Sequence, residues 1–300
     1  MKRRDFLARS LMGTPALAAG VASLSIINYK PPEESKTGLR LSFQESTAPG
    51  ICLEERLDFM EKYGIEGFEP RGTDLISRAG IYQRLLIGRT IKISAVCSGY
   101  KGFINCDNVS VRDRYKSILK DIIAFAGELG SVGVIIVPGT NWHTSGYHHS
   151  PITNYPVIEQ LFELAEYASK NKTTVILEPQ NRKESGCFQT VAEVARICRS
   201  LNNKGLRCMG DFWHMTREEV SDSDAFISAG EYLNHVHIAS RKTRYLPGAD
   251  GVTDDYTDGF TGLKKIKYQG YISFECGIKG DKGVLIPESI NLLRRQWQIS

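Results

Sequence analysis

The sequence predicts an α/β protein made of a single (β/α)8 barrel, a TIM barrel, preceded by a cleavable signal peptide. Short β-branched or apolar runs alternate along the chain with longer runs of helical periodicity, as in a parallel sheet with crossover helices. Eight strand–helix units can be distinguished, which is the number that closes such a barrel. A doubly wound open sheet shows the same alternation. It would carry a Gly-x-Gly-x-x-Gly turn after an early strand, and the sequence has none.

The first 24 residues have the organisation of a secretory signal. A basic start that includes Arg3 and Arg4 precedes a mildly apolar stretch over residues 11–24. Residues 16–19, Ala-Leu-Ala-Ala, are typical of a cleavage site. The arginine pair resembles a twin-arginine signal, which exports proteins after they have folded, so we expect a periplasmic or otherwise exported protein. The alternative is a frayed basic start on a cytosolic enzyme.

The expected organisation has three segments: the signal over residues 1–24, a linker over residues 25–37 and the barrel over residues 38–300. No other segment approaches 18 consecutive apolar residues, so we expect no membrane span. The formal charge of +4 comes partly from the basic N-terminus, so the barrel is nearly neutral and nucleic acid is not an expected partner. The sequence leaves the oligomeric state open, a homo-oligomer included.

The strands of the barrel are expected in regular succession, and the second is the weakest of them. They cover residues 39–43, 67–69, 92–97, 133–138, 174–178, 206–211, 235–239 and 271–275. Amphipathic helices with apolar residues three and four apart are expected between them, among others over residues 54–63, 111–129, 157–170 and 191–201.

Four consecutive strands of this series finish on or near a residue that can bind a metal ion: Glu178, Asp211, His237 and Glu275. The C-terminal ends of barrel strands form one open face with the loops that follow, so these side chains can converge there. A lone acid at a strand end usually means only that the strand has reached solvent, but four in succession weaken that explanation. Three carboxylates and an imidazole suit Mn²⁺, Co²⁺, Mg²⁺ or Zn²⁺, with open positions for two substrate oxygens.

The seventh strand carries two histidines, His235 and His237. Residues two apart on a strand share a face, so both rings can point into the barrel. We choose His237 as the ligand because it lies nearer the C-terminal rim, and we expect His235 to be buried beneath it.

The motifs around these residues also resemble the signature of the xylose isomerase-like barrel superfamily. They are Leu177–Arg182, Asp211–Met215, His235–His237 and Phe274–Glu275, and the resemblance spans roughly residues 38–297. The branch that they resemble most is the sugar isomerase and 3-epimerase group, of the tagatose and psicose epimerase type.

This resemblance implies one Mn²⁺-like ion held by Glu178, Asp211, His237 and Glu275. It also implies that Glu178 and Glu275 act as acid and base on opposite faces of the substrate carbon. A carbonyl held beside a cation has an acidic α-proton, because the cation stabilises the enediolate that forms.

Two further residues receive a role from the resemblance. His214 would hold a substrate oxygen, and Arg244 corresponds loosely to an arginine that contacts substrate. The alternatives are a surface histidine near a helix start for His214, and a solvated cationic run over residues 241–244 for Arg244.

The loop after the fourth strand is rich in aromatic and polar residues. Trp142 can stack on a sugar face, and His143 can contact a hydroxyl or donate a proton. The alternative is a loop that only caps the barrel.

We therefore expect a sugar isomerase or epimerase that removes a proton next to a carbonyl, with a small carbohydrate as its substrate. The alternative is a lyase on 3-keto glycosides, in which the same proton abstraction expels the C1 substituent. Export and the long acidic loop after the seventh strand favour a glycoside over a free monosaccharide. An endonuclease of the same superfamily would use a cluster of three metals with many histidine ligands, whereas this chain has six histidines in all and none of them ends the second or third strand. A sugar-binding protein would not need the metal set.

Overall fold

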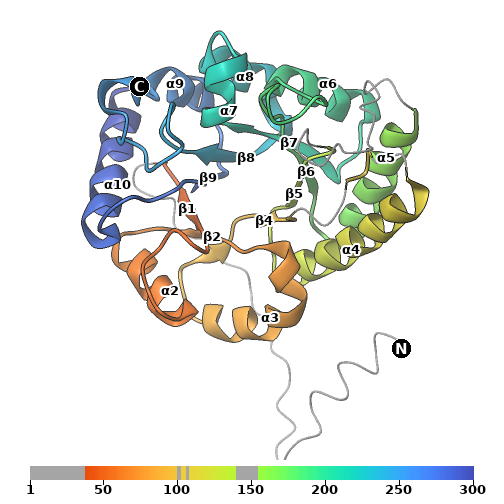
Figure 1. Cartoon of the computed structure of the whole chain (residues 1–300), viewed down its shortest axis with the longest axis horizontal. Coiled ribbons are helices and arrows are strands. Elements are labelled where there is room, and N and C mark those ends of the chain that lie inside the picture. The colour runs from red at the N-terminus through yellow and green to blue at the C-terminus, as the bar shows by residue number, and fades with distance from the viewer. Residues whose placement is uncertain (1–37, 100–102, 106–107, 140–154) are drawn as a thin grey trace, which may run out of the picture. The chain divides into compact units, whose positions relative to one another are not determined.

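The computed structural model describes residues 38–99, 103–105, 108–139 and 155–300. These residues form an all-parallel sheet of nine strands that curves into a nearly closed barrel, with helices packed around its outside (Figure 1). The expected signal and linker, residues 1–24 and 25–37, lie outside the described residues. In the described part of the chain, no helix is long and apolar enough to cross a membrane.

Hydrogen-bonded neighbours in the sheet lie in the order β3-β2-β1-β9-β8-β7-β6-β5-β4. The strands are β1 (Leu41–Gln44), β2 (Gly67–Glu69), β3 (Lys92–Ile93), β4 (Val96–Cys97), β5 (Val134–Ile136), β6 (Val175–Leu177), β7 (Leu206–Asp211), β8 (Leu233–Ile238) and β9 (Tyr271–Phe274). The first and last strands, β1 and β9, are paired, as a barrel requires.

The two ends of this strand order, β3 and β4, are the halves of the third strand expected from the sequence. The amide of Ser94 donates to the carbonyl of Phe68 on one side at 2.9 Å, and the amide of Val96 donates to the carbonyl of Gly133 on the other side, also at 2.9 Å. One extended segment therefore joins β2 to β5 and brings the sheet back on itself. The third strand was expected to be continuous, which is wrong because it is divided into β3 and β4. The other seven strands are confirmed with slightly shifted ends.

The helices cover the outer face of the barrel (Figure 1). They are α2 (Leu53–Lys62), α3 (Gly72–Leu86), α4 (Val109–Glu128), α5 (Tyr155–Lys170), α6 (Val191–Leu201), α7 (Phe212–Glu218), α8 (Asp222–Ala229), α9 (Thr257–Lys265) and α10 (Lys282–Ile299), with short 3-10 turns η2 (Gly230–Tyr232) and η3 (Gly251–Thr253). The helices expected between strands are confirmed. At the start of α6, Thr190 and Glu193 form a reciprocal capping box, which fixes where that helix begins.

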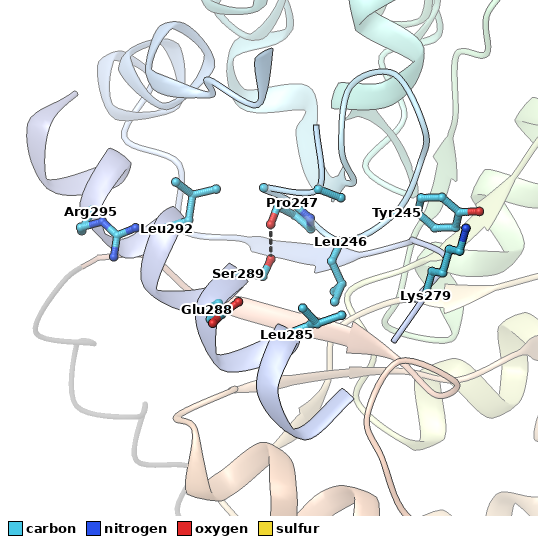
Figure 2. Close-up of a pocket in the computed structure, with 11 residues that line it drawn as sticks. Tyr245, Leu246, Pro247, Lys279, Leu285, Glu288, Ser289, Leu292 and Arg295 are labelled. Carbon is cyan, nitrogen blue, oxygen red and sulfur yellow. Dashed lines mark hydrogen bonds between the residues drawn. The ribbon is translucent and has the colours of Figure 1, made fainter. Parts of the chain in front are cut away.

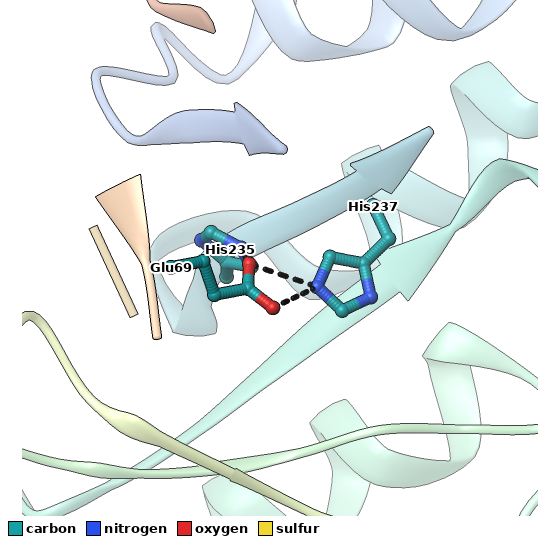
Figure 3. Close-up of side chains that lie close together, drawn as sticks. All are labelled: Glu69, His235 and His237. Carbon is teal, nitrogen blue, oxygen red and sulfur yellow. Dashed lines mark hydrogen bonds and ion pairs between the residues drawn. The ribbon is translucent and has the colours of Figure 1, made fainter. Parts of the chain in front are cut away.

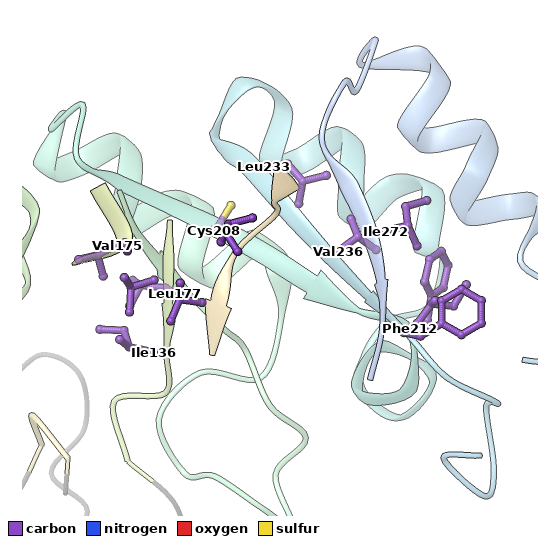
Figure 4. Packing of buried hydrophobic residues seen from close by; sticks show 14 of the residues in the cluster. Ile136, Val175, Leu177, Cys208, Phe212, Leu233, Val236 and Ile272 are labelled. Atoms are coloured by element: carbon purple, nitrogen blue, oxygen red, sulfur yellow. The ribbon is translucent and has the colours of Figure 1, made fainter. Parts of the chain in front are cut away.

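The hydrophobic core has two layers separated by the sheet. The larger cluster lies between the strands and the helices, where Val175, Leu177, Cys208 and Val236 pack together with other buried side chains (Figure 4). The smaller cluster is Ala95, Ile135, Ile176 and Met209. Strand alternation points Ile176 and Met209 to the same face as the residues two positions later, which are Glu178 and Asp211. The barrel interior is thus apolar beneath Glu178 and Asp211, whereas beneath His237 it carries His235, which pairs in register with Met209.

Candidate active site

The structure brings the four expected ligand residues together at the C-terminal ends of β6 to β9. Glu178 follows β6, Asp211 ends β7, His237 lies in β8 and Glu275 follows β9. Each offers one ligand atom, and these four atoms all lie within 4.8 Å of one another. Three of the side chains are almost fully buried, and that of Glu275 is 22% exposed. A single small cation can be reached by all four.

Local structure decides which atoms face this point. Oδ1 of Asp211 accepts the backbone N–H of Trp213 at 2.9 Å and so caps α7, which leaves Oδ2 for the site. Oε1 of Glu275 accepts the side-chain amide of Gln44 at 3.1 Å, which leaves Oε2. In each carboxylate, one oxygen thus accepts this hydrogen bond and the other is directed toward the site.

The buried polar atoms at this point fit a cation. Oε1 of Glu178 and Nδ1 of His237 have no hydrogen-bond partner among the residues that the structure describes. Nδ1 of His237 lies 3.9 Å from Oε1 of Glu178, and it lies 3.1 Å from Oε2 of Glu275 without the geometry of a hydrogen bond. A buried polar atom left unpaired costs about 1–3 kcal/mol. Since a divalent cation would satisfy such atoms together, the residues present fit a metal ion.

The electrostatics of the cluster also favour positive charge. Burial raises the pKa of Glu178 well above its ordinary value, and the neighbouring carboxylate of Glu275 raises it further. Burial alone would lower the pKa of His237, but Glu69 and Glu275 outweigh it and raise that pKa. Burial opposes ionisation of Glu275 as well, yet His237 and Arg244 hold its pKa below the ordinary range.

Arg244 lies in this cluster, on the loop after β8. Its Nη2 atom is 2.7 Å from Oε2 of Glu275 and 3.4 Å from Oδ2 of Asp211. Its guanidinium also lies over the ring of Trp213, 4.4 Å from the ring centre. The alternative of a solvated cation is therefore wrong for Arg244.

The acidic loop after β8 is held by its own carboxylates. Asp254 accepts the backbone N–H groups of Arg241 at 2.8 Å and of Gly248 at 2.7 Å, and Asp250 accepts that of Lys242 at 2.7 Å. The guanidinium of Arg241 is not solvated either, since it pairs with Asp222 at 2.6 Å. These acidic side chains shape the loop that carries Arg244.

His214 lies in the first turn of α7 and is 1% exposed, so the alternative of a surface histidine is wrong. Its Nδ1 atom accepts the backbone N–H of Asn181 at 3.1 Å, and burial lowers its pKa, which favours the neutral ring. The proton of the neutral ring therefore sits on Nε2, which faces Oδ2 of Asp211 at 3.5 Å and Oε1 of Glu178 at 3.8 Å.

The sequence that forms this barrel matches a known family. A family model described as a xylose isomerase-like TIM barrel matches residues 57–296. The chain belongs to this family. The match confirms the resemblance inferred from the four sequence motifs.

Within the xylose isomerase-like family, the chain is similar to several sugar epimerases. It is 29% identical to a 3-dehydro-D-guloside 4-epimerase of Escherichia coli (strain K12) over 237 residues, which are 76% of this chain and 88% of that protein. It is 33% identical to an L-ribulose 3-epimerase of Methylomonas sp. (strain DH-1) over 112 residues, which are 37% of this chain and 38% of that protein. Among solved structures, a 3-keto-D-glucoside 4-epimerase from E. coli superposes with a TM-score of 0.76 at 24% identity, covering 86% of this chain and 99% of that one.

Two parts of the predicted site have other outcomes. Trp142 and His143 lie outside the described residues, so their contact with a sugar stays a prediction. Glu69, at the end of β2, was missed. Its carboxylate lies between His235 and His237 (Figure 3). It obeys the rule that found the other acids, since it ends an expected strand, but that strand was the weakest in the sequence.

A pocket of about 470 Å³ lies on the same side of the barrel, between the loop after β8 and α10 (Figure 2). Its walls include Tyr245, Leu246, Lys279, Leu285 and Leu292. None of the four candidate metal ligands lines it, so it is separate from the point where those residues converge.

Proposed function

We propose that this chain is a metal-dependent sugar epimerase that moves a proton on the carbon next to a carbonyl, and that its substrate is a 3-keto glycoside. The observation that carries the proposal is the convergence of Glu178, Asp211, His237 and Glu275, with ligand atoms within 4.8 Å of one another. Membership of the xylose isomerase-like family and the similarity to sugar epimerases support it.

The chemistry needs a carbon acid and a stabilised anion. A divalent cation, with Mn²⁺ as the expected one, would be held by the four residues and would supply the positive charge that acidifies the proton next to the carbonyl. One carboxylate takes the proton from the carbon, and the electrons of the C–H bond move into the carbonyl to give an enediolate. The second carboxylate returns a proton to the opposite face of the same carbon.

We assign these two roles to Glu178 and Glu275. They follow β6 and β9, which are separated by β7 and β8 in the sheet, so they reach the substrate from different sides. His214 can donate the proton on Nε2 to a substrate oxygen, and the guanidinium of Arg244 can bind a second oxygen. Both groups are already directed at the carboxylates of the site.

The substrate class is supported by the extent of the similarity. The relative named for a 3-dehydro-guloside matches 76% of this chain, whereas the L-ribulose 3-epimerase matches 37%. A keto group on a glycoside ring presents an acidic proton on each neighbouring carbon, so the same site can act at either carbon.

A lyase is the second candidate, and one observation favours it. Both oxygens of Glu275 are engaged, one by Gln44 at 3.1 Å and one by Arg244 at 2.7 Å, whereas Oε1 of Glu178 has no partner among the described residues. A single base, Glu178, is enough to remove the proton at C2 of a 3-keto glycoside and expel the C1 substituent.

The experiment is to incubate the purified chain with Mn²⁺ in D₂O against free ketoses and 3-keto glycosides, and to follow the products by NMR and mass spectrometry. An epimerase gives deuterium at one carbon in an intact glycoside of inverted configuration. Release of the C1 substituent with formation of an unsaturated sugar gives the lyase instead.

Matched variants keep the outcome unambiguous. Glu178→Gln should abolish exchange under both candidates, whereas Glu275→Gln should abolish epimerisation but leave single-base elimination measurable. A metal-loaded chain that binds these sugars but exchanges no proton and releases no group would overturn both candidates and favour a sugar-binding protein.

A further inference from the structure

The carboxylate of Glu69 occupies a buried position directly behind the candidate metal ligand His237. Glu69 is 1% exposed, and both histidines of β8 are fully buried. Oε2 of Glu69 lies 2.9 Å from Nε2 of His235 and 3.1 Å from Nε2 of His237, and Oε1 lies 3.1 Å from the latter (Figure 3). The two rings thus turn the same nitrogen toward one carboxylate.

Gln44 connects this carboxylate to a second candidate ligand. Its side-chain amide donates to Oε1 of Glu69 at 3.0 Å and to Oε1 of Glu275 at 3.1 Å. Glu69 therefore receives hydrogen bonds from three side chains on β1 and β8. This buried set lies beneath two of the four residues that converge at the rim.

We propose that Glu69 is a positioning residue that fixes the ring of His237 for metal binding. A carboxylate accepts only, so when a metal ion displaces the proton of Nδ1, Glu69 keeps the remaining proton of His237 on Nε2 and the lone pair of Nδ1 is directed toward Glu178 and Glu275. Carboxylates that hold the second nitrogen of a ligating histidine set both its orientation and its basicity. The inference rests on the proposed metal site.

A second metal ion between Glu69, His235 and His237 is the competing explanation, because these three residues also form a compact group of potential ligands. Hydrogen bonds account for the contacts of this group. Nε2 of each histidine already faces a carboxylate oxygen at hydrogen-bond distance. Within the described residues, the unpaired nitrogen of His237 is Nδ1, which faces away from Glu69 and into the four-residue site.

The first test is Glu69→Gln, measured as the Kd for Mn²⁺ and as the visible spectrum of the Co²⁺-loaded chain. The amide can donate to Nε2 of His237, which moves the ring proton to Nδ1 and blocks the ligand atom. We expect the affinity for Mn²⁺ to fall about 10- to 100-fold, with an altered Co²⁺ spectrum. Thermal unfolding in EDTA checks that the variant is folded.

Glu45→Gln is the matched control. Glu45 follows β1, and its side chain is 11% exposed. It pairs with Arg78 at 2.7 Å and accepts the hydroxyl of Tyr82 at 2.9 Å, so the same amide substitution breaks a partly buried carboxylate network that contains none of the four candidate metal ligands. We expect its affinity for Mn²⁺ to match that of the unsubstituted chain.

A second measurement needs no substitution. Long-range ¹H–¹⁵N correlation spectra of the ¹⁵N-labelled, Zn²⁺-loaded chain identify which ring nitrogen of His237 binds the metal, with His237→Gln used to assign the signals. We expect Nδ1 bound and Nε2 protonated.

Three results would overturn the inference: an unchanged Kd in folded Glu69→Gln, metal on Nε2 of His237, or two Zn²⁺ ions per chain of which one is lost in His235→Gln. The failure of the proposed function looks different. If the unsubstituted chain binds none of these metals, the metal site itself is refuted, whereas metal binding that ignores Glu69 refutes only its positioning role.

Discussion

Nη2 of Arg244 lies 2.7 Å from Oε2 of Glu275, the oxygen that this carboxylate presents to the candidate metal site. The same guanidinium nitrogen is 3.4 Å from Oδ2 of Asp211. A fixed positive charge therefore shares two carboxylates with the proposed cation. It both stabilises the acidic cluster and opposes a second positive charge.

Arg244→Met should consequently tighten metal binding while it slows catalysis. Removing a repelling charge a few ångströms away is expected to lower the Kd for Mn²⁺ about tenfold, after solvent screening. Loss of the substrate contact should lower kcat/KM by about 100-fold. Calorimetric titration and steady-state kinetics measure the two effects. Arg182→Met, which removes an arginine whose side chain is 77% exposed, should change neither, and weaker metal binding in Arg244→Met would contradict the repulsion.

Metal removal should destabilise the fold. Without a cation, three carboxylates share one buried space, so metal binding adds stability that rises with the logarithm of the metal concentration. At about 100 times Kd the gain is about 2.7 kcal/mol, which corresponds to a rise in Tm of about 5–10 °C for a domain of this size. Differential scanning calorimetry with EDTA and then with Mn²⁺ tests this. Asp211→Asn should show little of the rise, and a full rise in that variant would place the ion elsewhere.

His214→Gln should impair turnover more than metal binding. The ring is held through Nδ1 by Asn181, so Nε2 is free to donate to a substrate oxygen. We expect kcat to fall about 100-fold, as for the loss of one preorganised donor, while the Kd for Mn²⁺ changes by less than about tenfold. Steady-state kinetics and metal titration of the same preparation measure the loss of kcat and the change in Kd for Mn²⁺. A loss of metal equal to the loss of activity would make His214 a ligand.

Asp254→Ala should loosen the loop that carries Arg244. Asp254 is 1% exposed and accepts three backbone N–H groups, those of Arg241, Gly248 and Asp250. Leaving these donors unpaired should cost about 3 kcal/mol of unfolding free energy, seen as a lower midpoint in urea, and should raise KM. Asp224→Ala, on an exposed position of α8, is the control and should stay within about 0.5 kcal/mol. Equal losses of unfolding free energy in Asp254→Ala and Asp224→Ala would contradict the role of Asp254 in holding the loop.

The export signal remains a proposal that cell fractionation can test. Replacing Arg3 and Arg4 together by lysine keeps the charge but removes the twin-arginine pair. We expect the full chain to stay in the cytoplasm as an unprocessed precursor, whereas the unsubstituted chain is exported and shortened. Export of the lysine variant by a pathway for unfolded chains would contradict the twin-arginine assignment.

Local sequence patterns predict most of the fold and the four candidate metal ligands, but not the residues that support these ligands. Strand alternation and strand ends are local properties, so the residue pattern alone places Glu178, Asp211, His237 and Glu275 at one rim. The support of these residues is not local. Gln44 and Glu275 are 231 residues apart in the chain and meet only because β1 pairs with β9.

Arg244 and Glu69 show why the remainder was harder. Arg244 stands in a loop whose path depends on hydrogen bonds to Asp254 and Asp250, and its φ of 57° is a left-handed conformation that no periodicity indicates. Glu69 ends a strand of only three residues, too short for alternation to be seen.

The pairing of β1 with β9 also sets an order of events for a newly made chain. Contacts between distant parts of a chain have the largest entropy cost of loop closure, so we expect the pairing of β1 with β9 to form late in folding. Glu275 and Gln44 cannot meet until it does. The acquisition of the ion then becomes the last step of maturation, completed wherever the whole barrel first exists, and a chain exported in the folded state would carry the metal of the compartment in which it was synthesised.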